Sequence, residues 1–219
     1  MNIEQARFNM VEQQIRPWDV LDPKVLDLLF QVKREDFVPS AYRTLAFADL
    51  EIPIGPNAGQ SMLPPRVEAK FLQEVGVKRT DRVLEIGTGT GYMAALLAAR
   101  AEHVVTIEKC PELAAKAQSN LQTAGIENVT VEVGDVSNGW SSRGPYYVIV
   151  ASGSMPSVPA EILRQLRVGG RLAIVVGEAP VMEAQLITCT GEGRYNTVNL
   201  FETVVARLEG ATGSKEFSF

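Results

Sequence analysis

The run from Val83 to Gly91, VLEIGTGTG, constrains the fold more than any other part of the chain. Its first four residues are typical of a buried strand, and the Ala- and Leu-rich stretch that follows it is typical of a helix. Three alternating glycines allow a tight turn with the backbone close to a ligand, and the first N–H groups of a following helix are free. The run therefore predicts a strand, a ligand-binding turn and a helix.

Strand and helix patterns alternate through the rest of the chain. We expect strands at 82–86, 103–108, 129–133, 146–151 and 170–176, and helices at 92–100, 111–124 and 159–166. Two further strand-like runs, 184–190 and 198–208, flank a turn at Gly191-Glu192-Gly193. This order predicts an α/β fold with a doubly wound, mostly parallel sheet and an antiparallel C-terminal hairpin.

An N-terminal extension precedes this core. Phe8, Val11 and Ile15 recur at helical spacing, and Asp22-Pro23 is typical of the start of a second helix. Residues 40–65 are rich in Pro and Gly, so we expect an ordered loop that crosses a functional site, followed by a helix at 67–75. We expect three parts: helices and a substrate-site loop at 1–65, packed on the core, a cofactor-binding core at 66–210, and a polar tail at 211–219.

Composition excludes several classes of function. The net charge of -5 argues against a broad nucleic-acid-binding face. Two cysteines and a single histidine, His103, make a metal site or a Ser-His-Asp triad improbable. We find no membrane-spanning run and no signal-peptide pattern, so we expect a cytoplasmic protein with no membrane partner.

The residues around the glycines indicate which cofactor the turn holds. A dinucleotide fingerprint places its third glycine where this chain has Tyr92, and Glu85 would repel a pyrophosphate. A carboxylate at Glu85 suits a cofactor that carries an ammonium and a sulfonium, as S-adenosylmethionine does. Glu108, at the end of the next strand, can accept hydrogen bonds from both ribose hydroxyls, and Asp135 lies where an acid can meet the adenine amino group.

Together these positions define a candidate cofactor site. Its expected residues are Gln60, Ser61, Glu85, Gly87, Thr88, Gly89, Gly91, Tyr92, Glu108, Lys109, Asp135 and Val136.

Several segments resemble one family of class I, Rossmann-like methyltransferases. They are 20–39, 48–55, 85–92, Gly134-Asp135 with Gly139-Trp140, Pro159-Ala160, 168–172 and 176–178. These segments are similar to protein-L-isoaspartate O-methyltransferases over about 20–208. The resemblance implies transfer of a methyl group to the α-carboxylate of an L-isoaspartyl residue in a damaged protein, a repair activity. Such a nucleophile, with a reference pKa of about 4, is already ionised at neutral pH and needs no strong base.

The chain departs from the family pattern at the loop that the family uses for its acceptor. Where the family has a Thr-hydrophobic-Ser run, this chain has Ser61-Met62-Leu63, so Leu63 takes the serine position and Ser61 the threonine position. A leucine side chain makes no hydrogen bond, so Ser61 becomes the candidate catalytic hydroxyl. Tyr146-Tyr147 replaces the family's Phe-Asp, and Val136-Ser137-Asn138 follows Asp135 where the family tends to have a glycine.

These departures leave three hypotheses open. The first is an isoaspartyl methyltransferase, the second is a divergent paralogue with a more apolar site around Leu63 and Tyr147 that methylates another acceptor, and the third is a non-catalytic cofactor-binding protein. The sequence does not decide between a monomer and a homodimer.

Overall fold

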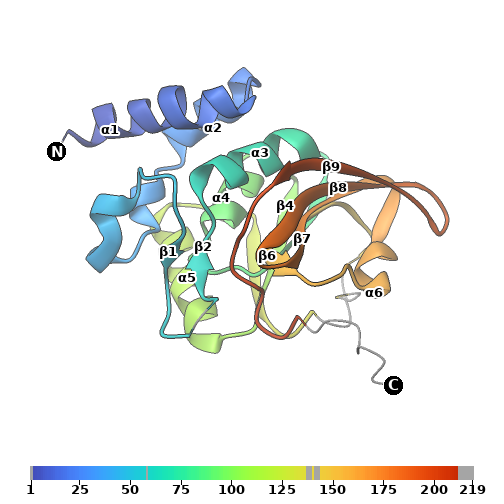
Figure 1. Cartoon of the computed structure of the whole chain (residues 1–219). Coiled ribbons are helices and arrows are strands. Elements are labelled where there is room, and N and C mark those ends of the chain that lie inside the picture. The colour runs from blue at the N-terminus through green and yellow to red at the C-terminus, as the bar shows by residue number, and fades with distance from the viewer. Residues whose placement is uncertain (1, 58, 137–139, 141–143, 212–219) are drawn as a thin grey trace.

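A computed structural model of the chain describes residues 2–57, 59–136, 140 and 144–211 (Figure 1). Its helices are α1 (Ile3–Asn9), α2 (Pro23–Gln31), α3 (Pro65–Val75), α4 (Tyr92–Ala98), α5 (Pro111–Thr123) and α6 (Ala160–Leu163). Its strands are β1 (Ile52–Pro53), β2 (Ser61–Met62), β3 (Arg82–Ile86), β4 (His103–Glu108), β5 (Val129–Val133), β6 (Tyr146–Met155), β7 (Leu166–Glu178), β8 (Val181–Gly191) and β9 (Arg194–Glu202). Ser137, Asn138, Gly139 and the tail residues 212–219 lie outside the described residues.

One sheet organises the molecule, with the strand order β5-β4-β3-β6-β7-β8-β9. The strands from β5 to β7 are parallel to their neighbours, and β8 and β9 extend the sheet antiparallel. The predicted doubly wound sheet with its antiparallel hairpin is confirmed. Because parallel strands end at the same edge, the glycine turn after β3 lies beside the ends of β4, β5 and β6.

Apolar side chains cover both faces of this sheet, as parallel strands require. Val83, Val104 and Val150 point to the face that α3 and α4 cover, and Leu84 and Ile149 point to the face that α6 covers. No helix in the described part of the chain is both long and apolar enough to span a bilayer.

The N-terminal helices pack against α3 and the sheet core (Figure 1). Asn2 and Asp22 cap α1 and α2 through their side-chain oxygens, as the N-cap signal at Asp22 predicts. Val11 and Ile15 are fully buried in a π-helical segment, Met10–Ile15, that continues α1. Phe8 is 49% exposed, so it does not share the buried face of Val11 and Ile15, although its helical spacing predicts that it should. The shift from α-helical to π-helical winding displaces the side chains after Asn9 from the expected spacing.

Several elements differ from prediction, among them the following three. The loop at 40–65 contains a short antiparallel pair, β1 and β2. The predicted helix at 159–166 shortens to α6 because its last residue, Leu166, already pairs with Tyr146 in the sheet. The predicted strand at 198–208 begins earlier, at Arg194, and ends at Glu202.

The residues after β9 leave the hairpin and run beside the end of β6. The backbone N–H of Ser154 donates to the Ala206 carbonyl at 2.9 Å, and the Leu208 N–H donates back to Ser154 at 2.9 Å. This C-terminal segment, residues 203–211, thereby reaches the edge of the sheet where the parallel strands end.

Candidate functional site

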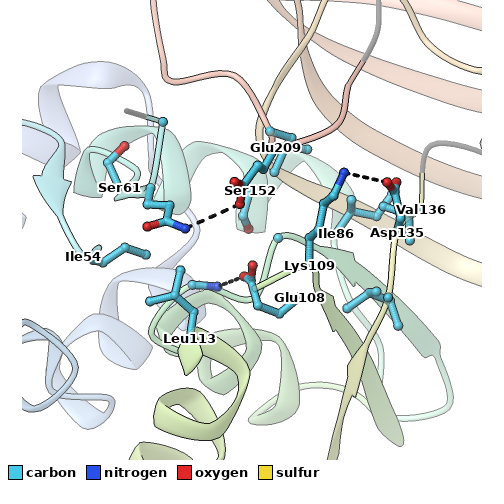
Figure 2. A pocket seen from close by; sticks show the side chains of 17 residues that line it. Ile54, Ser61, Ile86, Glu108, Lys109, Leu113, Asp135, Val136, Ser152 and Glu209 are labelled. Atoms are coloured by element: carbon cyan, nitrogen blue, oxygen red, sulfur yellow. Dashed lines mark hydrogen bonds and ion pairs between the residues drawn. The ribbon is translucent and has the colours of Figure 1, made fainter. Parts of the chain in front are cut away.

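A pocket lies at the ends of β3, β4, β5 and β6 (Figure 2). Three parts of the chain supply most of its lining, and Leu113 of α5 adds to it. The strand ends contribute Gly87, Gly89, Glu108, Lys109, Asp135, Val136 and Ser152. The loop between β1 and β2 contributes Ile54, Gln60 and Ser61, and the C-terminal segment contributes Leu208 and Glu209. Eight of the predicted cofactor residues therefore face one cavity: Gln60, Ser61, Gly87, Gly89, Glu108, Lys109, Asp135 and Val136.

Both the backbone conformation and the lack of room for a side chain require glycine at two positions of the turn. Gly87 has φ +88° and Gly89 has φ +54°, a region that residues with a Cβ rarely adopt. A Cβ at Gly87 would lie 2.5 Å from the Leu208 side chain, and one at Gly89 would lie 2.9 Å from Ile54. The backbone of the turn is thus in direct contact with both walls of the pocket.

Glu108 is held in a fixed orientation at the end of β4. One carboxylate oxygen accepts the N–H of Gly89 at 2.9 Å, and the other accepts the N–H of Cys110 at 3.0 Å. Beside it, Lys109 forms an ion pair of 2.7 Å with Asp135 at the end of β5 (Figure 2). The two acids expected to bind ribose and adenine therefore lie side by side in the pocket.

Glu85 lies deeper than the pocket wall. Its carboxyl group is fully buried, and it accepts hydrogen bonds from Thr106 at 2.6 Å and from Ser152 at 2.8 Å. Burial raises the pKa of Glu85 to about 8, although the two hydroxyl donors oppose this shift. Glu85, Thr88 and Tyr92 line a smaller cavity next to the pocket, whereas Gly91 lines neither cavity and instead lies against Leu121.

Ser61 is fixed by a carboxylate that the sequence did not indicate. Its hydroxyl donates to Glu51 at 3.0 Å, and the same Glu51 oxygen accepts the backbone N–H of Ala206 at 2.8 Å. Nearby, the Gln60 amide donates to Glu209 at 3.4 Å. These bonds join the β1–β2 loop and the residue before β1 to the C-terminal segment.

Neither Leu63 nor Tyr147 lines this pocket, although Leu63 lines the smaller cavity beside it. The Leu63 side chain is 3% exposed and packs in the core, while its carbonyl accepts a hydrogen bond from Arg34 at 2.7 Å. Tyr147 lies near the start of β6 and pairs with Arg167, far along the strand from Ser152. The expectation that Tyr147 makes the acceptor site more apolar is therefore wrong.

Sequence reasoning missed several residues of this region, and four of them make the contacts described above or line the pocket: Glu51, Ser152, Leu208 and Glu209. Ser152 could have been found, because it follows the predicted strand at 146–151 and must reach the same edge as Glu108. The other three depend on contacts between segments far apart in the sequence, which no local pattern reveals.

Comparison with known proteins decides the family. The model for protein-L-isoaspartate(D-aspartate) O-methyltransferase matches residues 5–206. The chain belongs to this family. It is therefore an S-adenosylmethionine-dependent methyltransferase, as the glycine turn and the acids at the strand ends predict.

Relatives and solved structures agree with this assignment. A protein-L-isoaspartate O-methyltransferase of Protochlamydia amoebophila is 43% identical over 80% of this chain and 82% of its own length. One of Staphylothermus marinus is 38% identical over 97% of this chain and 98% of its own. A solved protein-L-isoaspartate O-methyltransferase superposes with a TM-score of 0.81 at 26% identity, covering 94% of this chain and 67% of that one.

A Plasmodium falciparum structure, named for the same activity and bound to S-adenosyl-L-homocysteine, superposes with a TM-score of 0.79. It is 17% identical and covers 95% of this chain and 99% of that one, so it supports the fold alone.

Proposed function

We propose that this chain repairs damaged proteins by transferring the methyl group of S-adenosylmethionine to the α-carboxylate of L-isoaspartyl residues. One observation carries the proposal: the pocket above the glycine turn is walled on one side by fixed acids and on the other by the loop that holds Ser61. A donor and an acceptor can therefore meet at one point between β3 and Ser61.

The pocket fits the cofactor chemically. Glu108 has both oxygens fixed by backbone N–H groups, which leaves its remaining lone pairs for ribose hydroxyls. Asp135 and Val136 stand beside it for the adenine, and Gly87 and Gly89 let the backbone approach the ligand. We propose that residues 66–210 hold the cofactor and that residues 1–65 contribute the acceptor loop.

The chain's own residues align the reactants and exclude water. S-adenosylmethionine, when bound, supplies a methyl group on a sulfonium. A new bond joins the substrate oxygen to the methyl carbon as the sulfur–carbon bond breaks, which leaves a neutral ester and a neutral thioether. No proton moves, so positioning and desolvation are sufficient for catalysis.

Ser61 is the residue that we propose for the methyl-acceptor site, and its hydrogen bond to Glu51 determines what its hydroxyl can do. Because its proton lies toward Glu51, the Ser61 oxygen is left to accept a hydrogen bond. A peptide N–H next to the isoaspartyl carboxylate is a suitable donor. We infer that Ser61 positions the peptide and does not activate the nucleophile.

Labelled cofactor with an isoaspartyl peptide and its aspartyl isomer tests the proposal. The proposal predicts base-labile methyl ester on the isoaspartyl peptide and almost none on the isomer. Equal labelling of both peptides would favour the divergent-acceptor hypothesis.

A cytoplasmic location belongs to the same proposal and is supported by the free thiols of Cys110 and Cys189.

A further inference from the structure

A second, smaller cavity opens behind the glycine turn, between α3 and the start of α4. It shares Ser61, Gly87, Gly89 and Ser152 with the cofactor pocket, so the two spaces are neighbours across the turn. The ribose and adenine acids Glu108 and Asp135 line only the larger space. The smaller cavity therefore lies toward the end of the cofactor that is opposite the adenine.

Two buried hydroxyl groups line this cavity without a partner. Thr90 and Tyr92 are each 2% exposed, and neither the Thr90 Oγ1 nor the Tyr92 hydroxyl has a hydrogen-bond partner within the described residues. A buried polar atom without a partner costs free energy, so native structures rarely leave one unsatisfied. Two such atoms in one cavity indicate that a polar ligand group completes the site.

Two buried carboxyl groups set the charge of the site. Glu85 enters from β3 and Glu68 enters from α3, where Arg34 forms an ion pair with one Glu68 oxygen. Arg34 itself binds the Leu63 carbonyl, and neither it nor any other Lys or Arg lines the described part of the cavity. The described cavity wall therefore presents carboxylate and hydroxyl oxygens but no Lys or Arg side chain. Such a wall suits a ligand group that donates hydrogen bonds and carries positive charge.

We propose that Glu68 is a further cofactor-binding residue, which with Glu85, Thr90 and Tyr92 receives the amino group of the methionine part of S-adenosylmethionine. The inference rests on the cofactor assignment but not on the identity of the methyl acceptor. An ammonium has three N–H donors, and the cavity offers carboxyl and hydroxyl oxygens from β3, α3, α4 and the glycine turn to accept them.

Ligand-binding calorimetry on the full chain can isolate this contact. S-adenosylhomocysteine and 5′-methylthioadenosine share the nucleoside and the thioether sulfur, and the second lacks the amino acid end. Glu68→Gln keeps the size of the side chain and an oxygen for Arg34. It should weaken S-adenosylhomocysteine binding about tenfold, the ratio expected for one hydrogen bond between charged groups, and leave 5′-methylthioadenosine binding unchanged.

Two further variants complete the design. Glu74→Gln is a matched control on α3, because Glu74 pairs with Lys70 away from the cavity. It should change neither affinity. Glu68→Asp keeps the charge but shortens the side chain, and it should show the same selective loss if Glu68→Gln does not fold.

Equal weakening of both ligands in the Glu68 variants would overturn the inference, because Glu68 would then act only as a support for Arg34. Unchanged binding of both ligands would overturn it as well. A wild-type chain that binds S-adenosylhomocysteine but does not methylate isoaspartyl peptides contradicts the proposed acceptor and leaves this binding result interpretable. A wild-type chain that binds neither ligand contradicts both.

Discussion

The Ser61 hydroxyl and the Glu51 carboxylate are joined by a hydrogen bond of 3.0 Å, and the same oxygen of Glu51 accepts the backbone N–H of Ala206 at 2.8 Å. One carboxylate therefore holds the acceptor loop against the C-terminal segment. Leu63 stands where the family has its serine, and the hydroxyl that we propose in its place, that of Ser61, is oriented by a residue ten positions earlier.

Removal of the Glu51 carboxylate should impair acceptor binding more than cofactor binding. Glu51→Ala frees the Ser61 hydroxyl and the Ala206 N–H, so we expect KM for the isoaspartyl peptide to rise by about tenfold. Steady-state kinetics with each substrate varied in turn provide the measurement. Glu192→Gln, in the exposed β8–β9 turn, is the control and should leave both KM values unchanged. A rise confined to the cofactor KM would contradict this account.

The glycine turn should not tolerate a side chain at Gly87. Gly87→Ala combines a φ of +88° with a Cβ 2.5 Å from Leu208, so the turn must shift and S-adenosylhomocysteine should no longer raise the melting temperature. Adding Leu208→Ala removes the collision but not the backbone strain of about 1–2 kcal/mol. The double variant should therefore recover part of the ligand-induced shift. Full recovery would show that strain at Gly87 is unimportant.

Local sequence patterns predicted the parts of the fold that depend on local chemistry. The apolar run at Val83 and Leu84 and the proline at the start of α5 give the strands and helices, and the shared edge of parallel strands brings Glu108 next to Asp135. Local sequence patterns could not predict where Glu51, Glu68 and Glu209 lie in the site, because their roles arise from partners on distant segments. The early end of β9 has the same origin, since residues 206–208 pair with Ser154 of β6 instead.

Removal of only one member of the buried ion pair between Arg34 and Glu68 should lower the free energy of unfolding strongly. Arg34→Met leaves the Glu68 carboxylate buried without its partner and the Leu63 carbonyl without its donor. We expect a loss of about 3–5 kcal/mol in the free energy of unfolding, measured by denaturant titration. Arg34→Met with Glu68→Leu removes both charges and should be more stable than Arg34→Met alone. A double variant no more stable than the single one would contradict the pairing.

The stability of the ligand-free protein should fall as the pH rises from about 4.5 to about 8. Burial is the main cause that raises the pKa of Glu68 to about 7 and that of Glu85 to about 8, from ordinary values of 4.5. The folded state therefore binds more protons than the unfolded state between pH 4.5 and 8. The stability due to these groups is complete below pH 4.5 and is lost as the pH passes through 7 and 8.

Chemical denaturation across this pH range measures the effect. Glu85→Gln cannot ionise, so it should abolish the decrease between pH 7 and 8, while a shallower decrease from pH 4.5 to 7, due to Glu68, remains. An unchanged profile in this variant would show that Glu85 is already ionised in the ligand-free protein.

The central claim is that this pocket methylates isoaspartyl carboxylates with Leu63 in place of the family's serine. A competition assay tests it most directly: one tube holds equal amounts of an isoaspartyl peptide and its aspartyl isomer, and mass spectrometry of the separated peptides gives their relative kcat/KM. The account predicts methyl ester almost entirely on the isoaspartyl peptide, with the yield reduced by Glu51→Ala. Cofactor turnover without a preference for the isoaspartyl peptide would contradict it.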